Sequence, residues 1–305
     1  MSIDALQAKI RAKKNPVAVA LDLQRELIPQ AVLRRAMDEN GETLRGLAEA
    51  YFAFGVAVLD ALADVVPAVK LQTGFFEALG PDGLSVMARL CAYAKSLDYY
   101  VMVETMRADA EPVAALLAET YFGEIAVDGK TPGLYGADAV SLSGFLGSDG
   151  IKPYLPYCKE GKNLFVLAKS SNKSSREVQD LISGDRVVYT VMADLAMRWG
   201  GDLMGKSGYA ELGLTVGATH PEVLRQLRSR YDRMFFLVTG FGEQGSTVKD
   251  MEAAFDKFGH GAVISAGDCL LGAWKKQGEN TDFANAIRAS AIKLRTDLAV
   301  HVTVM

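Results

Sequence analysis

The stretch VALDLQREL, Val19 to Leu27, decides between the two common folds that alternate strands with helices. It runs from an apolar strand into the segment that follows it. A doubly wound open sheet normally places a glycine-rich phosphate-binding loop directly after its first strand. This stretch contains no glycine. It therefore favours the rival fold, in which parallel strands close into a (β/α)8 barrel.

Short apolar runs rich in Val, Ile and Leu continue this pattern along the chain. Buried parallel strands have continuous apolar sequences because helices cover them. The predicted strands are 17–22, 65–70, 99–104, 137–142, 163–168, 212–216, 234–238 and 262–265. The predicted helices are 42–63, 81–96, 111–122, 150–159, 174–199 in one or two pieces, 221–230, 248–257 and 282–300. This alternation predicts a single TIM barrel of eight βα units.

The domain organisation follows from what the chain lacks between these elements. With 305 residues, half of them hydrophobic, the composition permits one large α/β domain or two ordinary ones. The sequence shows no linker, low-complexity segment or convincing short repeat. We therefore expect one domain over 1–305, with an N-terminal helix at 1–14 and the barrel at 15–300.

Charge and segment composition limit the partners and the compartment. The 33 basic and 37 acidic residues give a net charge of −4, too mild for a nucleic-acid or membrane surface. A small molecule or a protein is the expected partner. The segment MSIDALQAKIRAKKNP carries charges throughout and lacks the apolar core of a signal peptide. No apolar run reaches the roughly 18 to 20 residues of a membrane span, so we expect a cytoplasmic protein.

The cysteines and histidines argue against disulfides and metal sites. Cys91, Cys158 and Cys269 are odd in number, far apart and in apolar context, which indicates reduced, mostly structural thiols. The three histidines form no cluster with them. We therefore expect no zinc site, no other metal and no cofactor.

In a TIM barrel the chemistry lies at the carboxyl ends of the strands. The polar residues at the predicted ends are Asp22, Lys70, Glu104, Asp109, Ser143, Ser170, Ser171, Asn172, Thr219, Gln244 and Asp268. Asp22 has two interpretations: it is a candidate site residue, and a carboxylate at this position also commonly caps the following helix or turn. Lys70 ends a strand that should be buried, and a buried ammonium group needs a partner. Lys70 therefore indicates a functional charge network.

Two further stretches carry candidate site residues. In VMVETMRADA, Val101 to Ala110, period-two alternation places Glu104 and Met106 on one face and turns Arg107 away. Met106 is equally compatible with barrel-core filler. VTGFGEQGS, residues 238–246, has three glycines in six residues after the seventh strand. Its backbone N–H groups and Gln244 suit a phosphate, although a flexible turn fits the pattern equally well.

Taken together, these segments resemble orotidine 5′-phosphate decarboxylase, in the longer bacterial form of that family. The likeness runs from Asn15 to Asp297 and rests on ordered segments. They are NPVAVALDLQRELIP, VPAVKLQTGFFEALGPDGL, SLSGFLGSDGIKPYL, FVLAKSSNKSSREVQDL, TVGATHPEVLRQLR and FFLVTGFGEQG. The resemblance implies a TIM barrel, a homodimer, a nucleotide-like ligand and decarboxylation of orotidine 5′-phosphate to UMP in pyrimidine synthesis.

The resemblance also assigns roles to residues. It places Asp22 and Ser171 at the substrate, Gln244 at the 5′-phosphate, and Lys70 in the catalytic charge network. The family signature is Asp-x-Lys-x-x-Asp, whose lysine delivers a proton to C6 as CO₂ leaves, and whose last Asp reaches into the neighbouring site. In this chain the stretch begins at Glu104, ends at Asp109 and carries Met106 in place of the lysine.

A second departure concerns the phosphate. The family has a short Ser/Asn run and then a phosphate-binding Arg after the eighth strand, whereas this chain has Ser265-Ala266-Gly267-Asp268. Thr239 likewise replaces the family's Pro before the glycine-rich loop. Two hypotheses follow. In the first the chain is a decarboxylase, or a related lyase, that retains Lys70, Glu104 and Asp109. In the second it is a catalytically silent paralogue that binds a less anionic ligand or a partner protein.

Overall fold

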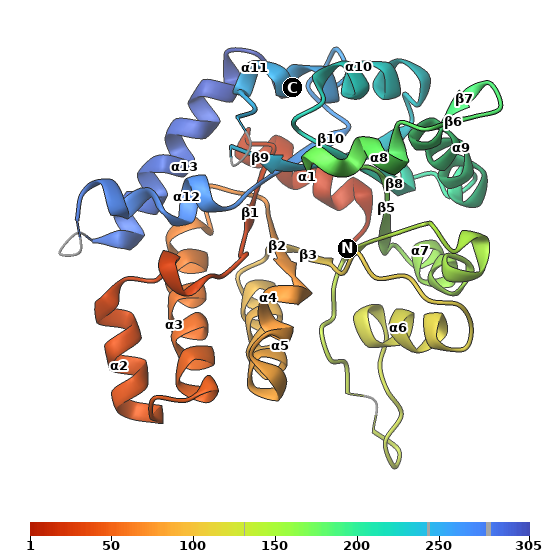
Figure 1. Cartoon of the computed structure of the whole chain (residues 1–305). Coiled ribbons are helices and arrows are strands. Elements are labelled where there is room, and N and C mark those ends of the chain that lie inside the picture. The colour runs from red at the N-terminus through yellow and green to blue at the C-terminus, as the bar shows by residue number, and fades with distance from the viewer. Residues whose placement is uncertain (131, 243–244, 279–281) are drawn as a thin grey trace.

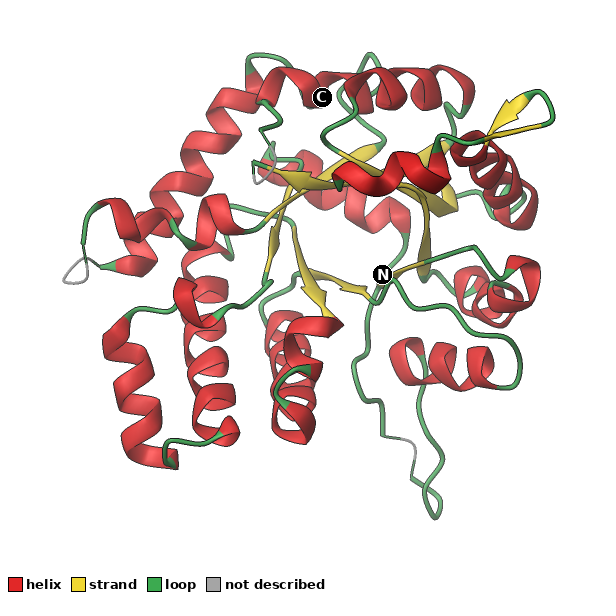
Figure 2. Cartoon of the chain, in the orientation of Figure 1, coloured by secondary structure: helices red, strands yellow, loops and turns green. Residues whose placement is uncertain are grey.

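The computed structural model of the chain describes residues 1–130, 132–242, 245–278 and 282–305. Eight parallel strands form a closed barrel, with helices arranged around it (Figure 2). In chain order the barrel strands are β1 (Val17–Ala20), β2 (Ala68–Gln72), β3 (Tyr100–Glu104), β4 (Ala139–Leu142), β5 (Asn163–Lys169), β8 (Ala210–Gly217), β9 (Met234–Phe241) and β10 (Ala262–Ala266). β10 pairs with β1 and closes the ring. The predicted TIM barrel is confirmed.

All eight predicted strands overlap an observed one, but the second begins three residues later than predicted. It was expected at 65–70, but β2 begins at Ala68. The backbone N–H groups of Val65 and Val66 both donate to the carbonyl of Leu62, and so they complete the last turn of the preceding helix. Pro67 follows and has no N–H group to donate to a neighbouring strand. Lys70 is therefore in the middle of β2 rather than at its end.

The helices depart further from the expected pattern. They are α1 (Ile3–Lys13), α2 (Gln30–Asn40), α3 (Leu44–Leu62), α4 (Thr73–Glu77), α5 (Gly80–Ser96), α6 (Val113–Phe122), α7 (Leu155–Lys159), α8 (Arg176–Gln179), α9 (Val188–Gly200), α10 (Pro221–Arg230), α11 (Val248–Met251), α12 (Asp268–Leu271) and α13 (Phe283–Ala299). Short 3-10 turns occupy Arg25–Leu27, Gly147–Gly150, Lys152–Tyr154, Lys173–Ser175, Glu252–Ala254 and Ala273–Lys276. The helices α2, α4 and α12 were not predicted.

Three predicted helices are shorter or broken. Between α8 and α9 the chain forms a two-stranded antiparallel hairpin, β6 (Ile182–Ser183) and β7 (Arg186–Val187), which projects from the barrel (Figure 1). The hairpin turn contains Gly184 with φ +69°, a conformation that favours glycine. The segment 150–159 begins at the last residue of one 3-10 turn and continues with a second 3-10 turn and α7, and 248–257 is helical only to Ala254.

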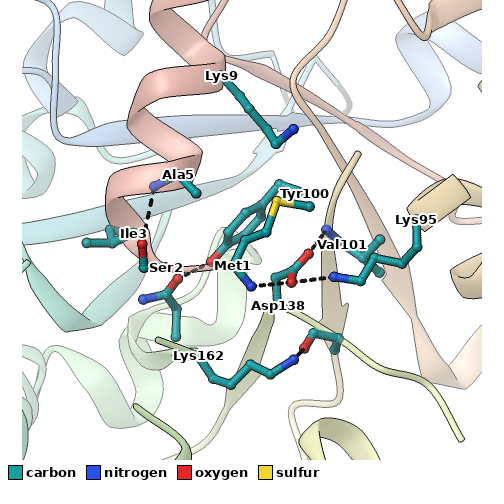
Figure 3. A network of polar contacts seen from close by, with 12 residues as sticks. Met1, Ser2, Ile3, Ala5, Lys9, Lys95, Tyr100, Val101, Asp138 and Lys162 are labelled. Carbon is teal, nitrogen blue, oxygen red and sulfur yellow. Dashed lines mark hydrogen bonds and ion pairs between the residues drawn. The ribbon is translucent and has the colours of Figure 1, made fainter. Parts of the chain in front are cut away.

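The base of the barrel is closed by α1. Its apolar side chains Ile3, Leu6 and Ile10 are fully buried against barrel residues such as Tyr100 and Phe165. A polar network supports this packing (Figure 3): the buried Asp138 carboxylate accepts from the backbone N–H of Val101 at 2.9 Å and from the Lys95 ammonium group. Because the base is filled, a ligand must approach from the opposite end, where the strands have their carboxyl termini.

Within the described ranges, none of the helices is both long enough and apolar enough to cross a membrane.

Candidate active site

Three charged side chains meet at the carboxyl ends of β1, β2 and β3. The Nζ atom of Lys70 lies 3.2 Å from Oδ1 and 3.1 Å from Oδ2 of Asp22, and it also donates to Oε2 of Glu104. Strand register explains the meeting, because β2 is hydrogen-bonded between β1 and β3, with Ala20 opposite Lys70 and Gln72 opposite Glu104. Lys70 and Glu104, two members of the predicted charged set, therefore lie together with Asp22, which was predicted as a substrate-binding residue.

This cluster is buried, and burial governs its protonation. Lys70 is 2% and Glu104 3% exposed, and the Asp22 side chain is 15% exposed. Burial alone would lower the pKa of Lys70, but the negative charges of Asp22 and Glu104 outweigh burial and raise it above the usual lysine value. Burial raises the pKa of Asp22, and the Lys70 charge opposes that rise. With both carboxylates ionised, the cluster has a net charge of −1.

A cavity of about 170 Å³ opens over the cluster. Its lining residues are Asp22, Lys70, Gln72, Glu104, Met106, Ser170, Ser171, Thr239, Gly240, Ser265 and Gly267. Lys70 is the only Lys or Arg among these described lining residues. The second carboxylate oxygen of Glu104, Oε1, is buried and has no hydrogen-bond partner in the described part of the chain. A buried carboxylate oxygen without a donor is costly, so a ligand donor at this point would be stabilising.

Met106 lines the cavity for a reason that differs from the expected one. Strand β3 ends at Glu104, and Met106 has a left-handed backbone with φ +48°, so the two residues do not share the face of one extended strand. The N–H groups of Thr105 and Met106 both donate to the carbonyl of Ser141 on β4, at 2.9 and 3.2 Å. This turn directs the chain so that Met106 still lines the cavity beside Glu104.

The other charged residues of the signature lie elsewhere. Arg107 points away as expected, and its Nη2 donates to Oε1 of Glu77 at 2.5 Å. That hydrogen bond raises the pKa of Arg107. Asp109 is half-buried, and its Oδ1 accepts from the N–H of Ala110 at 2.9 Å. Asp109 is not among the described residues that line the cavity of its own chain.

The loop after β5 brings Ser171 to the opposite wall. The hydroxyl of Thr219 donates to the carbonyl of Ser171 at 2.8 Å and holds the loop in place. Gly240 has φ +75°, and a Cβ there would lie 2.5 Å from the Ser171 hydroxyl oxygen. A Cβ on Gly217 would lie 2.5 Å from the Cα of Ser171. The two glycines therefore allow the loop to approach strands β8 and β9 closely.

The predicted phosphate end is only partly described. Gln244 lies outside the described residues. Asp268 begins α12 directly after Gly267, which lines the cavity. The Asp268 carboxylate is 3.4 Å from the Nε2 donor of Gln24, and its charge contributes to the raised pKa of Asp22. The residue after the eighth strand therefore adds negative charge next to a cluster that is already negative.

A wider groove of about 710 Å³ adjoins the cavity at Ser171. It is lined by Ser171, Asn172, Lys173, Arg176, Asp180, Thr219 and His220. Asp180 is paired with the buried Lys169, at 2.6 Å. The groove provides room for a ligand that is longer than the cavity.

Sequence reasoning missed some of the cavity wall. Gln72 was not proposed, although it stands two positions after Lys70 on the same strand and so shares its face. Thr239 and Ser265 were noted only as departures from a family pattern, yet both line the cavity. Within the described ranges, no three or more His, Cys, Asp or Glu residues are grouped as a metal site would require.

The fold and the cavity together define a class of protein. A (β/α)8 barrel with a polar cavity at the carboxyl ends of its strands is the usual design for a small-molecule site. A sequence model described as the orotidine 5′-phosphate decarboxylase / HUMPS family matches residues 15–267. The chain belongs to this family.

Individual relatives agree. Orotidine 5′-phosphate decarboxylase from Caldicellulosiruptor bescii is 33% identical over 273 residues, 89% of this chain and 90% of the relative. The enzyme of that name from Clostridium perfringens strain SM101 is 32% identical over 300 residues, 98% of each chain. The structure of Leishmania donovani OMP decarboxylase has a TM-score of 0.71 at 26% identity, covering 97% of this chain and 99% of that one. The structure of Leishmania donovani UMP synthase has a TM-score of 0.76 at 26% identity. The match covers 99% of this chain but only 57% of that longer protein.

Proposed function

We propose that this chain is a family member with strongly impaired orotidine 5′-phosphate decarboxylase activity, and that its cavity takes a ligand less anionic than that nucleotide. The observation that carries the proposal is Met106, which lines the cavity beside Glu104 where the family signature has a lysine. Decarboxylation at C6 builds a carbanion-like centre, which needs a positioned cation and a proton donor. A thioether supplies neither.

Lys70 is a poor substitute for the missing lysine. Its ammonium group already contacts both Asp22 oxygens and Oε2 of Glu104. Its raised pKa makes it a weaker acid than an ordinary lysine. Loss of one preorganised electrostatic group typically costs about 10² to 10³ in rate, and the family lysine serves both as cation and as acid.

The charges around the cavity also disfavour a nucleotide phosphate. By the resemblance, Asp268 stands where an arginine would contact the phosphate, and such a contact is worth about 1.5 to 3 kcal/mol. A carboxylate roughly 5 Å from a phosphate adds repulsion of about 3 kcal/mol per unit charge at an effective dielectric near 20. The expected ligand is therefore neutral or cationic where the substrate of the relatives is anionic.

The second candidate is a working decarboxylase or related lyase that uses Lys70, Glu104 and Asp109, as the names of the relatives suggest. Under either function we propose one 305-residue unit that acts in the cytoplasm as a homodimer. Two exposed apolar side chains, Leu116 (59% exposed) and Phe145 (78%), support the dimer. In a dimer Asp109 would reach the partner's cavity, in keeping with its distance from its own.

The deciding experiment follows the conversion of orotidine 5′-phosphate to UMP by the purified protein, with the Clostridium perfringens relative as positive control. We expect no turnover at ordinary enzymatic rates, about 1 to 10³ per second. The double variant Met106→Lys/Asp268→Arg should gain measurable activity. Lysine and methionine are both unbranched at Cβ, so the left-handed backbone at position 106 admits either. Ordinary turnover by the unaltered protein would refute the proposal.

A binding experiment separates the ligand classes. If anionic repulsion governs the cavity, uridine should bind at least as tightly as UMP, and Asp268→Arg should reverse that order. Calorimetric titration of both ligands against both proteins gives the comparison. Tighter binding of UMP than of uridine by the unaltered protein would mean that the phosphate finds an attractive site despite Asp268.

A further inference from the structure

The described charged groups at the cavity are two carboxylates, Asp22 and Glu104, and one ammonium group, Lys70. Lys70 sits between Asp22 and Glu104 and contacts both, so one buried cation serves two carboxylates. Oε2 of Glu104 is bound by Lys70, whereas Oε1 has no partner within the described residues. Glu104 is 3% exposed, so a donor to this oxygen has to come from within the cavity that Glu104 lines. Asp268 adds further negative charge near Asp22.

We propose that the cavity is a binding site for the primary ammonium group of a small organic ligand, which donates to Oε1 of Glu104 and supplies the missing positive charge. The inference deepens the proposed function and rests on it, since it names the chemical class of the less anionic ligand. The carrying observation concerns the described residues: a buried carboxylate oxygen that has no partner among them faces a cavity whose described lining has one cation, Lys70, for the two carboxylates of Asp22 and Glu104.

The volume and the lining of the cavity suit an ammonium group better than a larger cation. A volume of about 170 Å³ is below the roughly 300 Å³ at which pockets for drug-sized ligands begin. An ammonium group has three N–H donors, and the wall offers hydroxyl acceptors at Ser171 and Thr239 besides Glu104. The remainder of the ligand can extend past Ser171 into the adjoining groove.

An ammonium ion is also a better match than a neutral donor. A neutral hydroxyl or amide would satisfy Oε1 of Glu104 but would leave the excess negative charge in place. An ammonium group adds the attraction between opposite unit charges to the hydrogen bond itself, and that attraction is stronger in the lower dielectric of a buried site than in water. The Met106 side chain supplies an apolar surface for the carbon atoms that carry the ammonium group.

The test uses four probes of similar size on the full-length protein: ethylammonium, methylammonium, tetramethylammonium and ethanol. Ethylammonium and methylammonium should bind saturably in calorimetric titration, with weak affinity suited to their few atoms, and should raise the Tm as they bind. Tetramethylammonium has the charge without N–H donors, and ethanol has a donor without the charge. Neither should bind measurably at the same ionic strength.

Three variants locate the site. Glu104→Gln keeps the shape but removes the charge, and should weaken ethylammonium binding at least tenfold. Met106→Lys should abolish binding, because its own ammonium group occupies the cavity. Glu77→Gln is the matched control: it removes an exposed carboxylate that pairs with Arg107 outside the cavity, and should leave the affinity unchanged.

The outcomes separate this inference from the proposed function. If no amine binds saturably, or if Glu104→Gln and Met106→Lys bind ethylammonium as the unaltered protein does, the ammonium site is wrong. The proposed loss of decarboxylation still stands in that case, because it depends on turnover of orotidine 5′-phosphate. Because Met106→Lys retains Glu104, it still tests the site if Glu104→Gln fails to fold.

Discussion

Replacing Lys70 by methionine removes the cation from the buried cluster while keeping most of the side-chain stem. The Nζ atom lies 3.1 Å from Oδ2 of Asp22, where a unit charge pair is worth about 5 kcal/mol at an effective dielectric near 20. Desolvation offsets much of this attraction. Removing one partner of a buried ion pair typically costs about 3 to 5 kcal/mol, because the other charge stays buried and unpaired. We expect a loss of this size for Lys70→Met at pH 7.

The loss should depend on pH in a definite direction. Burial already raises the pKa of Asp22, and without Lys70 it should rise further. A carboxyl group with a raised folded-state pKa binds its proton more tightly than the unfolded chain does. Its stabilising effect is complete below the unfolded value of about 4 and is lost as the pH rises through the folded value. The difference in free energy of unfolding between Lys70→Met and the unaltered protein should therefore shrink from pH 7 to pH 5.

Urea denaturation, followed by circular dichroism and fluorescence, measures this difference. With a slope of about 3 kcal/mol per molar urea, the midpoint should fall by about 1 to 1.7 M at pH 7. Lys293→Met is the matched control, because Lys293 forms an exposed pair with Asp297 and should change stability by less than about 1 kcal/mol. A Lys70→Met loss no larger than the control, or one independent of pH, would refute the electrostatic reasoning.

Three other substitutions or reactions test the structure elsewhere. Gly240→Ala should cost about 1 to 3 kcal/mol in urea denaturation, because a left-handed backbone is strained for alanine and the new Cβ would meet Ser171. Arg228→Met should cost about 3 to 5 kcal/mol, since the buried guanidinium donates to five backbone carbonyl groups, whereas the exposed Arg230→Met should cost less than about 1 kcal/mol. At pH 8 a thiol reagent should modify Cys269, which is exposed, and spare the two buried cysteines, whose pKa values burial raises to about 12. A loss of stability below about 1 kcal/mol in Gly240→Ala or Arg228→Met would contradict the contacts described for that residue. Reaction of Cys91 or Cys158 in the folded protein would contradict their burial.

The barrel could be predicted because its strands carry local signals. Each buried parallel strand is a continuous apolar run, and the glycine-free stretch after β1 excludes the usual phosphate loop. The helix α2 escaped prediction because only Leu33 and Ala36 along it are buried. It lies on the outside of α3 rather than on the sheet (Figure 1), so its sequence lacks the wide apolar stripe of a barrel-covering helix.

The candidate site was predictable in part for the same reason. Asp22 follows β1, Lys70 lies in β2 and Glu104 ends β3, and parallel neighbouring strands bring their carboxyl ends to one edge. The position of Met106 depends instead on hydrogen bonds from its own N–H and that of Thr105 to the carbonyl of Ser141. That contact joins residues far apart in sequence, so the alternation rule could not anticipate it. The local sequence pattern could therefore predict that the three charged side chains lie close together, but it could not predict the turn at Met106.

The left-handed turn at Met106 also bears on how this protein can change over generations. The turn accepts methionine and lysine alike, so the backbone offers no resistance to an exchange between them. Methionine has the single codon AUG, and a change of its middle base gives AAG, which encodes lysine. The cation of the family signature is therefore one point mutation away from this sequence.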